Sequence, residues 1–183
     1  SAIADAHLEN FGKRIIPDYR FDKANLIVNF GADFLGTWIA PVTFTKRYSR
    51  LRKPDEKDPK MSKHIQFESY MSLTGSKADE RFRIRPSEEK LILANIYNAL
   101  CSEKRLIPAK TPQQGFDISG IVRELKENKG TSLVLSGSND LQTQLFVNAI
   151  NYLLDNYGQT IDLFHPWNTR QGDDRKLEDL ITS

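Results

Sequence analysis

Apolar residues recur along the chain at two different spacings, and these predict strands that alternate with helices. Short apolar runs predict strands at Asn25–Phe30, His64–Phe67, Phe82–Ile84, Ser132–Ser136 and Ile161–Phe164. Helical spacing of apolar residues predicts helices at Ile3–Phe11, Pro41–Leu51, Ser87–Ser102, Ile118–Asn128, Leu141–Tyr157 and Arg175–Ile181. Because a helix of crossover length separates most successive strands, we expect an α/β fold with an open, mostly parallel sheet flanked by helices.

Capping residues mark the expected ends of several helices. Gly12 is suited to end the first helix, and Gly158 the helix that starts at Leu141. Ser87 can cap the helix that it opens, and Glu88 and Glu89 suit the positive end of that helix's dipole.

A stretch rich in proline and glycine, residues 107–116, divides the predicted elements into two groups. We expect a Rossmann-like subregion over residues 1–106, a connector over 107–116, and a second α/β subregion over 117–183.

Composition narrows the classes of partner and cofactor. The 183 residues carry a formal net charge of +2, which favours neither nucleic acid nor an anionic membrane as partner. The apolar runs are too short to span a bilayer, and the chain opens without a signal-peptide pattern, so we expect any export signal to lie outside it. Cys101 is the single cysteine, which excludes an internal disulfide, a four-cysteine iron–sulfur site and a cysteine-rich zinc site.

The sequence contains no recognisable catalytic arrangement. His7, His64 and His165 are far apart and have no metal-ligand spacing. The chain lacks both the Gly-x-Ser-x-Gly pattern and a P-loop. We therefore expect no catalytic residue and no metal site, and the chain alone does not look like a complete enzyme.

Two short loops after predicted strands are weak candidates for ligand binding. Gly31 would let a phosphate approach the backbone, and Asp33 would accept a hydrogen bond from a ribose or a guanine; alternatively, the loop is a tight turn that Asp33 caps. The stretch Gly137–Asp140 offers either an anion site at a helix N-terminus or a simple N-cap at Ser138 or Asn139, and we favour the cap.

The most informative stretch is the hydroxyl-rich segment Glu68–Asp79. Ser72 and Thr74 have hydroxyls that suit phosphate or sugar oxygens, Glu68 suits a ribose or base edge, and Arg85 follows the next strand. The same residues can instead satisfy their own backbone in a Ser/Thr turn, with Asp79 and Arg85 paired as ions across the loop.

This segment resembles a motif of the molybdopterin oxidoreductases of the dimethyl sulfoxide reductase superfamily. That family has a strand ending Asp-Pro-Arg-x-Ser-x-Thr-Ala-x-x-Ala-Asp, followed by Ile-Arg-Pro-Gly-Thr-Asp and a helix. Here the corresponding stretches are Glu68–Asp79 and Ile84–Glu89. The resemblance implies a sheet of the formate dehydrogenase and dimethyl sulfoxide reductase type. In an active member, the residues matching a pterin guanine dinucleotide site would be Gly31, Asp33, Glu68, Ser72, Thr74, Asp79 and Arg85.

Within the superfamily, the chain is most similar to the molybdopterin-oxidoreductase-like region of the iron–sulfur subunit of alternative complex III. Further matching stretches are Pro17–Ala24, Ile27–Trp38, Met61–Ser69, Met71–Gly75, Ala78–Asp79, Arg85–Glu89, and the Ala149–Asn151 helix with Gly158. The resemblance implies a fragment of a larger respiratory electron-transfer subunit. Its partners would be the ferredoxin-like region of the same polypeptide and other subunits, on the periplasmic side, with no direct membrane insertion.

The departures from the active family pattern weaken the cofactor interpretation. Tyr70 replaces an arginine that would complement phosphate, and Ser87 replaces a glycine that would allow close backbone approach. Glu88 and Glu89 add negative charge where a pyrophosphate would lie. We therefore expect a non-catalytic scaffold without molybdenum, with iron–sulfur clusters elsewhere in the parent subunit. The alternative is a cofactor-binding fragment of a true molybdopterin guanine dinucleotide-dependent oxidoreductase.

Overall fold

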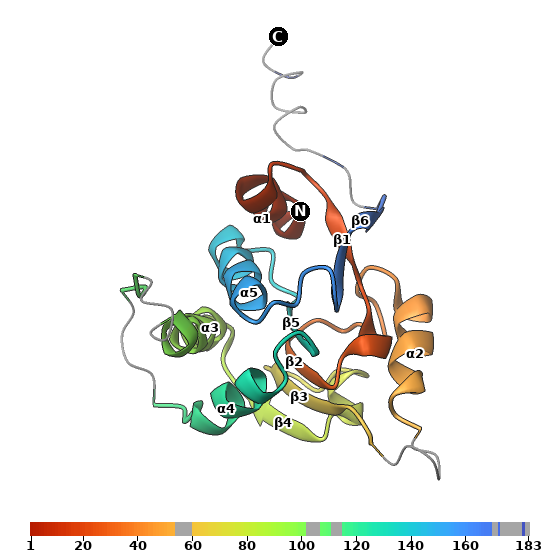
Figure 1. The fold of residues 1–183 in the computed structure, drawn as a ribbon, viewed down its shortest axis with the longest axis vertical. Coiled ribbons are helices and arrows are strands. Elements are labelled where there is room, and N and C mark those ends of the chain that lie inside the picture. Colours follow the sequence, from red (N-terminus) through yellow and green to blue (C-terminus); the bar gives the residue numbers. More distant parts are fainter. Residues whose placement is uncertain (54–59, 102–106, 111–114, 170–171, 173–180, 182–183) are drawn as a thin grey trace.

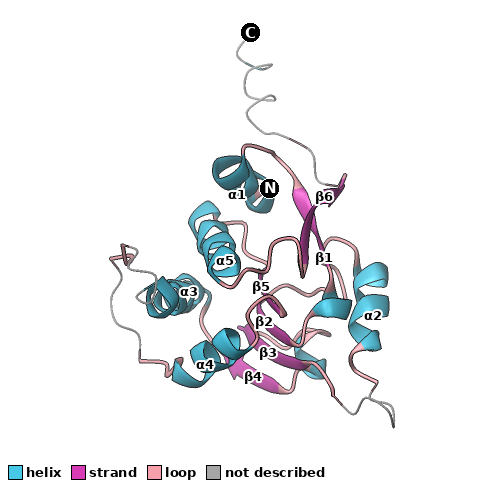
Figure 2. Ribbon diagram, in the orientation of Figure 1, coloured by secondary structure: helices cyan, strands magenta, loops and turns pink. Residues whose placement is uncertain are grey.

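A parallel sheet of four strands forms the centre of the molecule. The computed structural model describes residues 1–53, 60–101, 107–110, 115–169, 172 and 181. The strands of the sheet are β2 (Leu26–Phe30), β3 (Lys63–Glu68), β4 (Glu80–Arg83) and β5 (Ser132–Ser136). Their order is β4-β3-β2-β5, and every neighbouring pair is parallel. The predicted α/β class, with a parallel sheet flanked by helices, is confirmed (Figure 1, Figure 2).

Helices cover both faces of the sheet and enclose two hydrophobic cores (Figure 1). One core lies under α3 (Pro86–Cys101), α4 (Ser119–Glu127) and α5 (Leu141–Leu153). The other lies under α2 (Pro41–Arg50), the start of α1 (Ala2–Phe11) and the 3₁₀ turn η1 (Phe21–Lys23). Val28 and Phe30 of β2 face the first core, and Ile27 faces the second. The β2 sequence is apolar almost throughout because both of its faces are buried.

The strands β1 (Ile16–Tyr19) and β6 (Ile161–Trp167) form a separate antiparallel pair beside the sheet. Their register places Asp18 opposite Asp162, and each of these carboxylates binds an arginine from another segment. The predicted strand at Ile161–Phe164 is confirmed, but it does not join the parallel sheet. The strand β1 was not predicted, because Pro17 and Asp18 interrupt its short apolar run.

Helix α3 begins one residue earlier than expected. Pro86 occupies its first position, where the missing N–H costs no hydrogen bond. The Glu88 carboxylate reaches back to accept the Arg85 N–H at 2.7 Å. Ser87 therefore lies inside the first turn, and the prediction that it caps the helix is wrong. At α1 the prediction is confirmed, since Gly12 follows the helix with a left-handed φ of 70°.

Helix α5 differs from its prediction at both ends. Its N-cap is Asp140, whose carboxylate accepts the N–H of the third helical residue at 2.9 Å, and not Ser138 or Asn139. The helix also ends before Tyr157, because Asp155 adopts a positive φ of 54° and the chain turns there toward β6.

Strands from both predicted subregions lie in one sheet. β5, from residues 117–183, pairs directly with β2, from residues 1–106, and the cores contain side chains of both stretches. Of the connector, the structure describes residues 107–110 and 115–116. The helix predicted at 175–181 lies outside the described residues apart from Ile181. The division into two subregions stays a prediction.

Candidate functional site

The three loops that the sequence analysis singled out leave the same edge of the sheet. β2 runs into Gly31, β3 into Ser69 and β5 into Gly137. The chain passes from β2 to β3 and β4, and then returns to β5 on the other side of β2. Doubly wound sheets bind ligands at such a reversal, outside the carboxyl ends of the strands. The predicted loops therefore occupy the position where a binding site is expected.

Close backbone contacts fill the sheet edge where β3, β2 and β5 end. The Gly31 N–H donates to the Phe67 carbonyl oxygen, and the Gly137 N–H donates to the Phe30 carbonyl oxygen, both at 2.8 Å. Gly31 has a φ of 64°, and a Cβ on Gly137 would lie 2.7 Å from the Gly31 carbonyl oxygen. Glycine is thus required at both positions, once for conformation and once for space. The Gly31 N–H is already engaged in the sheet rather than directed at a phosphate.

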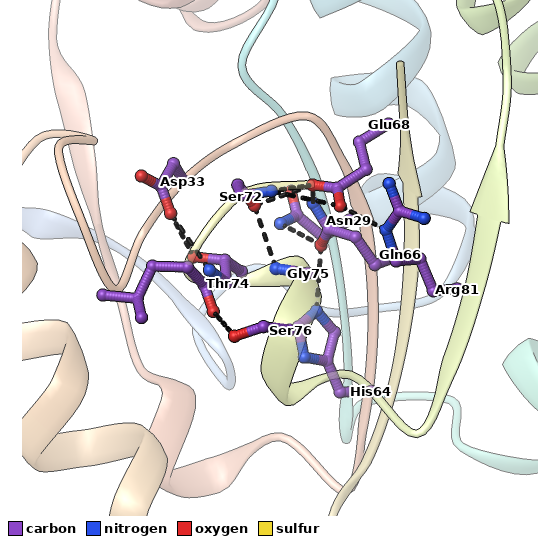
Figure 3. Close-up of polar contacts among 11 residues, drawn as sticks. Asn29, Asp33, His64, Gln66, Glu68, Ser72, Thr74, Gly75, Ser76 and Arg81 are labelled. Carbon is purple, nitrogen blue, oxygen red and sulfur yellow. Dashed lines mark hydrogen bonds and ion pairs between the residues drawn. The ribbon is translucent and has the colours of Figure 1, made fainter. Parts of the chain in front are cut away.

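Asp33 joins the loop after β2 to the loop after β3 (Figure 3). Its Oδ1 accepts from the Thr74 hydroxyl at 2.8 Å and from the Thr74 N–H at 3.1 Å. The Thr74 hydroxyl oxygen in turn accepts from the Leu35 N–H at 2.9 Å. The structure therefore brings the predicted site residues Asp33 and Thr74 together, but as partners of each other. The Asp33 side chain therefore does not cap the segment that follows it, contrary to the alternative interpretation.

Glu68 is the centre of a second, buried set of contacts (Figure 3). Arg81 Nε donates to its Oε1 at 2.5 Å, and Gln66 Nε2 and the Ser72 hydroxyl donate to its Oε2 at 3.1 and 2.7 Å. Burial disfavours the charged carboxylate, but these donors outweigh it and hold the pKa of Glu68 below its usual value. The Ser72 hydroxyl oxygen also accepts from the Gly75 N–H at 2.9 Å, which agrees with the Ser/Thr-turn interpretation.

Asp79 pairs with an arginine that precedes β3 rather than with Arg85. Arg52 donates to both carboxylate oxygens of Asp79, at 2.6 and 2.9 Å, and the His64 N–H donates at 2.7 Å. Burial alone would raise the pKa of Asp79. The hydrogen bonds from Arg52 and His64 have the larger effect, and the pKa of Asp79 lies below its usual value. The expected Asp79–Arg85 ion pair is wrong, and Arg85 lies exposed just before α3.

A row of buried polar side chains on β3 was not predicted as part of the site. Gln66 Oε1 accepts from Asn29 Nδ2 at 2.7 Å and from His64 Nε2 at 3.0 Å. Because an amide oxygen only accepts, His64 carries its proton on Nε2. Its Nδ1 lies 3.2 Å from the oxygen of the Tyr48 hydroxyl, whose single proton donates to the Lys77 carbonyl oxygen, also at 3.2 Å. Burial lowers the pKa of His64 to about 4, so the ring is neutral near pH 7. The signal in the sequence was the polar residue at every second position of β3, from His64 to Glu68.

The space that remains at the sheet edge is small. A hollow of about 70 Å³ is lined by Gly31, Phe67, Glu68, Ser69, Tyr70, Ser72, Ile84, Pro86 and Glu89. Glu89 accepts a hydrogen bond from the Ser136 hydroxyl, and burial raises the pKa of this carboxyl group. Pockets for cofactors of drug size or larger have volumes of about 300–1,000 Å³. In this arrangement the residues do not fit a pterin dinucleotide, because their polar groups bind one another and the hollow holds two acidic side chains.

The remaining features considered in the sequence are the histidines, the single cysteine and the apolar runs. In the part of the chain that the structure describes, no three His, Cys, Asp or Glu side chains gather where they would hold a metal ion. His7 bonds the Ile3 carbonyl oxygen within α1, and His165 bonds Asp162 in β6. Cys101 is buried. None of the described helices combines the length and the apolar character needed to cross a membrane.

Comparison with known proteins does not assign the chain to a family. No protein-family model matches the chain, and no curated protein is significantly similar to it.

Proposed function

We propose that the chain is a molybdopterin-oxidoreductase-like domain that serves as a non-catalytic scaffold in a respiratory electron-transfer subunit. The subunit would belong to a quinol:electron-acceptor oxidoreductase of the alternative complex III type. One observation carries the proposal: five of the side chains that match the family's dinucleotide motif, those of Asp33, Glu68, Ser72, Thr74 and Asp79, are hydrogen-bonded to the protein itself. Asp33 binds Thr74, Glu68 binds Ser72 and Arg81, and Asp79 binds Arg52.

Two physical arguments favour the scaffold over a cofactor site. A dinucleotide would have to displace buried, charge-assisted hydrogen bonds around Glu68, and leaving such a carboxylate without partners costs about 3–5 kcal/mol. A dinucleotide in the hollow would also bring its negative charge close to Glu68, whose contacts favour the charged form. Together with the Asp33–Thr74 contact, these hydrogen bonds hold the loops after β2 and β3 in fixed positions, which is what a scaffold requires.

In this role the sheet would hold a ferredoxin-like region of the same polypeptide against other subunits of the complex. Electrons would pass through iron–sulfur clusters in that region, and no residue of this chain would take part in the chemistry. The location that goes with this role is the periplasmic side of the membrane.

Metal and cofactor analysis of the parent subunit, purified from its own cells, tests the proposal. We expect iron, with molybdenum and pterin guanine dinucleotide each well below one per subunit by native mass spectrometry. Stoichiometric molybdenum with dinucleotide would overturn the scaffold and support a cofactor-binding fragment of a true molybdopterin oxidoreductase. Calorimetric titration of the isolated chain with guanosine monophosphate adds a direct measurement, and we expect no binding heat at millimolar ligand.

A further inference from the structure

The loop after β3 exposes three large apolar side chains close together in the sequence. Tyr70, Met71 and Leu73 are 71%, 67% and 55% exposed. Single exposed apolar residues are ordinary on protein surfaces, whereas a group of them is typical of an interaction site. This group lies at the sheet edge where the family motif occurs. The contacts within the site do not account for the exposure of these three side chains.

The backbone beneath these side chains is held in place by hydrogen bonds. The Ser72 hydroxyl binds Glu68, the Thr74 N–H binds Asp33, and the Ser76 N–H donates to the Ser72 carbonyl oxygen at 3.0 Å. The Ser76 hydroxyl donates to the Leu73 carbonyl oxygen at 2.7 Å (Figure 3). A loop fixed in this way loses little conformational entropy when it binds a partner. The buried polar contacts therefore present the apolar side chains in one arrangement.

Two exposed arginines border the apolar group. Arg83 lies opposite Glu68 in the β3–β4 register, and Arg85 directly precedes Pro86, which lines the same hollow as Tyr70. Neither arginine forms an ion pair within the part of the chain that the structure describes. The acidic residues nearest to them in sequence are engaged: Asp79 with Arg52, Glu80 with Lys63, and Glu88 with the Arg85 N–H. Arg83 and Arg85 therefore add positive charge beside the group, while the acidic side chains of the hollow, Glu68 and Glu89, are bound to Arg81 and Ser136.

We propose that Tyr70, Met71 and Leu73, bordered by Arg83 and Arg85, form the docking surface for another protein subunit whose contact surface is apolar and flanked by carboxylates. Tyrosine, methionine and arginine are the residue types enriched at protein interfaces. The hollow of about 70 Å³ beside Tyr70 has room for one small side chain of that subunit. This docking proposal rests on the proposed scaffold role in one respect: that role identifies the assembly in which docking is tested.

The charges and the size of the group argue against two other occupants. A symmetric contact between two copies would pair this surface with an identical one, whose exposed arginines offer no carboxylates to Arg83 and Arg85. Three apolar side chains and two arginines are also less than stable membrane anchoring requires, and the net charge of +2 adds little attraction to anionic lipid.

Hydroxyl-radical labelling tests whether the surface is covered. The labelling rates of Tyr70, Met71 and Leu73 are compared between the isolated chain and the assembly purified from its own cells. We expect at least fivefold slower labelling in the assembly, with unchanged labelling of the exposed Val42 on α2. Equal rates at the three residues in both samples would overturn the proposal.

Charge reversal tests the chemistry of the partner. We expect the double variant Arg83→Glu/Arg85→Glu to weaken retention of the neighbouring subunit at least tenfold, with an unchanged circular dichroism spectrum. The matched control is Lys13→Glu/Lys23→Glu, which makes the same change in net charge at exposed residues elsewhere and should leave retention unchanged. Equal retention in both double variants would overturn the proposal.

Three further measurements separate the possible occupants. Sedimentation of the isolated chain detects self-association, and flotation with phosphatidylcholine–phosphatidylglycerol vesicles detects lipid binding. Either behaviour, if Tyr70→Ser abolishes it, would overturn docking to a protein subunit. Mass spectrometry of the same assembly detects pterin dinucleotide. Its presence would refute the scaffold role, and the charge-reversal result would still decide the docking proposal on its own.

Discussion

The Gly75 backbone lies against the Glu68 carboxylate with no room for a side chain. A Cβ at this position would be 1.9 Å from Glu68 Oε1, well inside van der Waals contact. Oε1 is the oxygen that binds Arg81. A methyl group at residue 75 would therefore have to move a buried carboxylate that already has a charged partner.

We expect Gly75→Ala to lower the free energy of unfolding by about 2–4 kcal/mol, because it disrupts a buried ion pair and the hydrogen bonds around it. Urea denaturation followed by circular dichroism measures the change. Gly120→Ala is the matched control: nothing lies within 4 Å of its Cβ position, and alanine favours the helix it occupies. Equal unfolding midpoints for the two variants would contradict the tight contact with Glu68.

His64 makes stability depend on pH in a direction that its burial determines. The pKa of His64 is about 4 in the folded protein and 6.5 for the unperturbed side chain, so the unfolded chain binds more protons between these values. Stability therefore falls as the pH drops from about 6.5 toward 4. Between pH 7 and pH 5 we expect a loss of about 2 kcal/mol from this residue.

Urea denaturation at the two pH values measures this loss, and His64→Gln should remove it. His7 is also buried with a lowered pKa and contributes in the same direction, so the comparison is between wild type and variant at each pH. His165→Gln serves as the control, because that ring is 80% exposed. A pH dependence in His64→Gln as steep as in the wild type would show that the buried ring does not titrate in this way.

At the scale of elements, α5 completes the hydrogen bonding of the outer strand of the sheet. Asn151 is buried, and its amide both donates to the Val134 carbonyl oxygen at 2.8 Å and accepts from the Val134 N–H at 3.1 Å. The Asn156 amide donates to Asn151 Oδ1 at 2.9 Å and to the Ser132 hydroxyl at 3.1 Å. The helix side chain thus takes the place of a neighbouring strand at β5, which protects that edge from pairing with other chains.

We expect Asn151→Leu to destabilise the protein by about 3 kcal/mol, because it leaves the N–H and C=O groups of Val134 buried without partners. Thermal or urea denaturation measures the difference. The control is Asn95→Leu in α3, where the side chain is half-buried and bonds only its own helix at the Leu91 carbonyl oxygen. We expect less than about 1 kcal/mol there. A loss at Asn151 no larger than at Asn95 would mean that β5 finds other partners.

The sequence predicted well those elements whose own residues determine the apolar pattern. It predicted poorly those elements whose existence or ends depend on contacts with distant segments. The apolar runs of β2 and β5 and the periodicity of α3 were sufficient, because burial on fixed faces dictates those residues. β1 was missed because its pairing with β6 depends on a segment more than a hundred residues away in the chain. The end of α5 was misplaced because Asp155 adopts positive φ, a conformation that non-glycine residues seldom take.

At the sheet edge, the sequence indicated the position of several residues but not their hydrogen-bonding partners. Glu68, Ser72 and Thr74 lie at the sheet edge, as the motif and the strand ends indicated. Their contacts with Arg81 and Asp33 depend on strand register and on loop packing, which composition and spacing do not reveal. A close match to a ligand motif therefore does not distinguish a site that binds a ligand from one whose residues bind each other.

At the scale of the whole molecule, the arrangement of strands predicts how the chain unfolds. β5 comes from the stretch after the 107–116 connector, yet it pairs along its length with β2, and the hydrophobic cores on both faces contain side chains from before and after the connector. Removing either stretch would expose apolar residues of the other. Among the described residues, each core combines side chains of the two stretches, so we expect the described sheet and its helices to unfold together.

Urea denaturation followed by two probes tests this expectation. Tryptophan fluorescence reports on Trp38 and Trp167, which pack in the core beneath α2, whereas far-ultraviolet circular dichroism reports on helices on both faces. We expect both probes to give one transition with the same midpoint and the same slope. A fluorescence transition separated from the circular dichroism transition would show that the two faces of the sheet unfold separately.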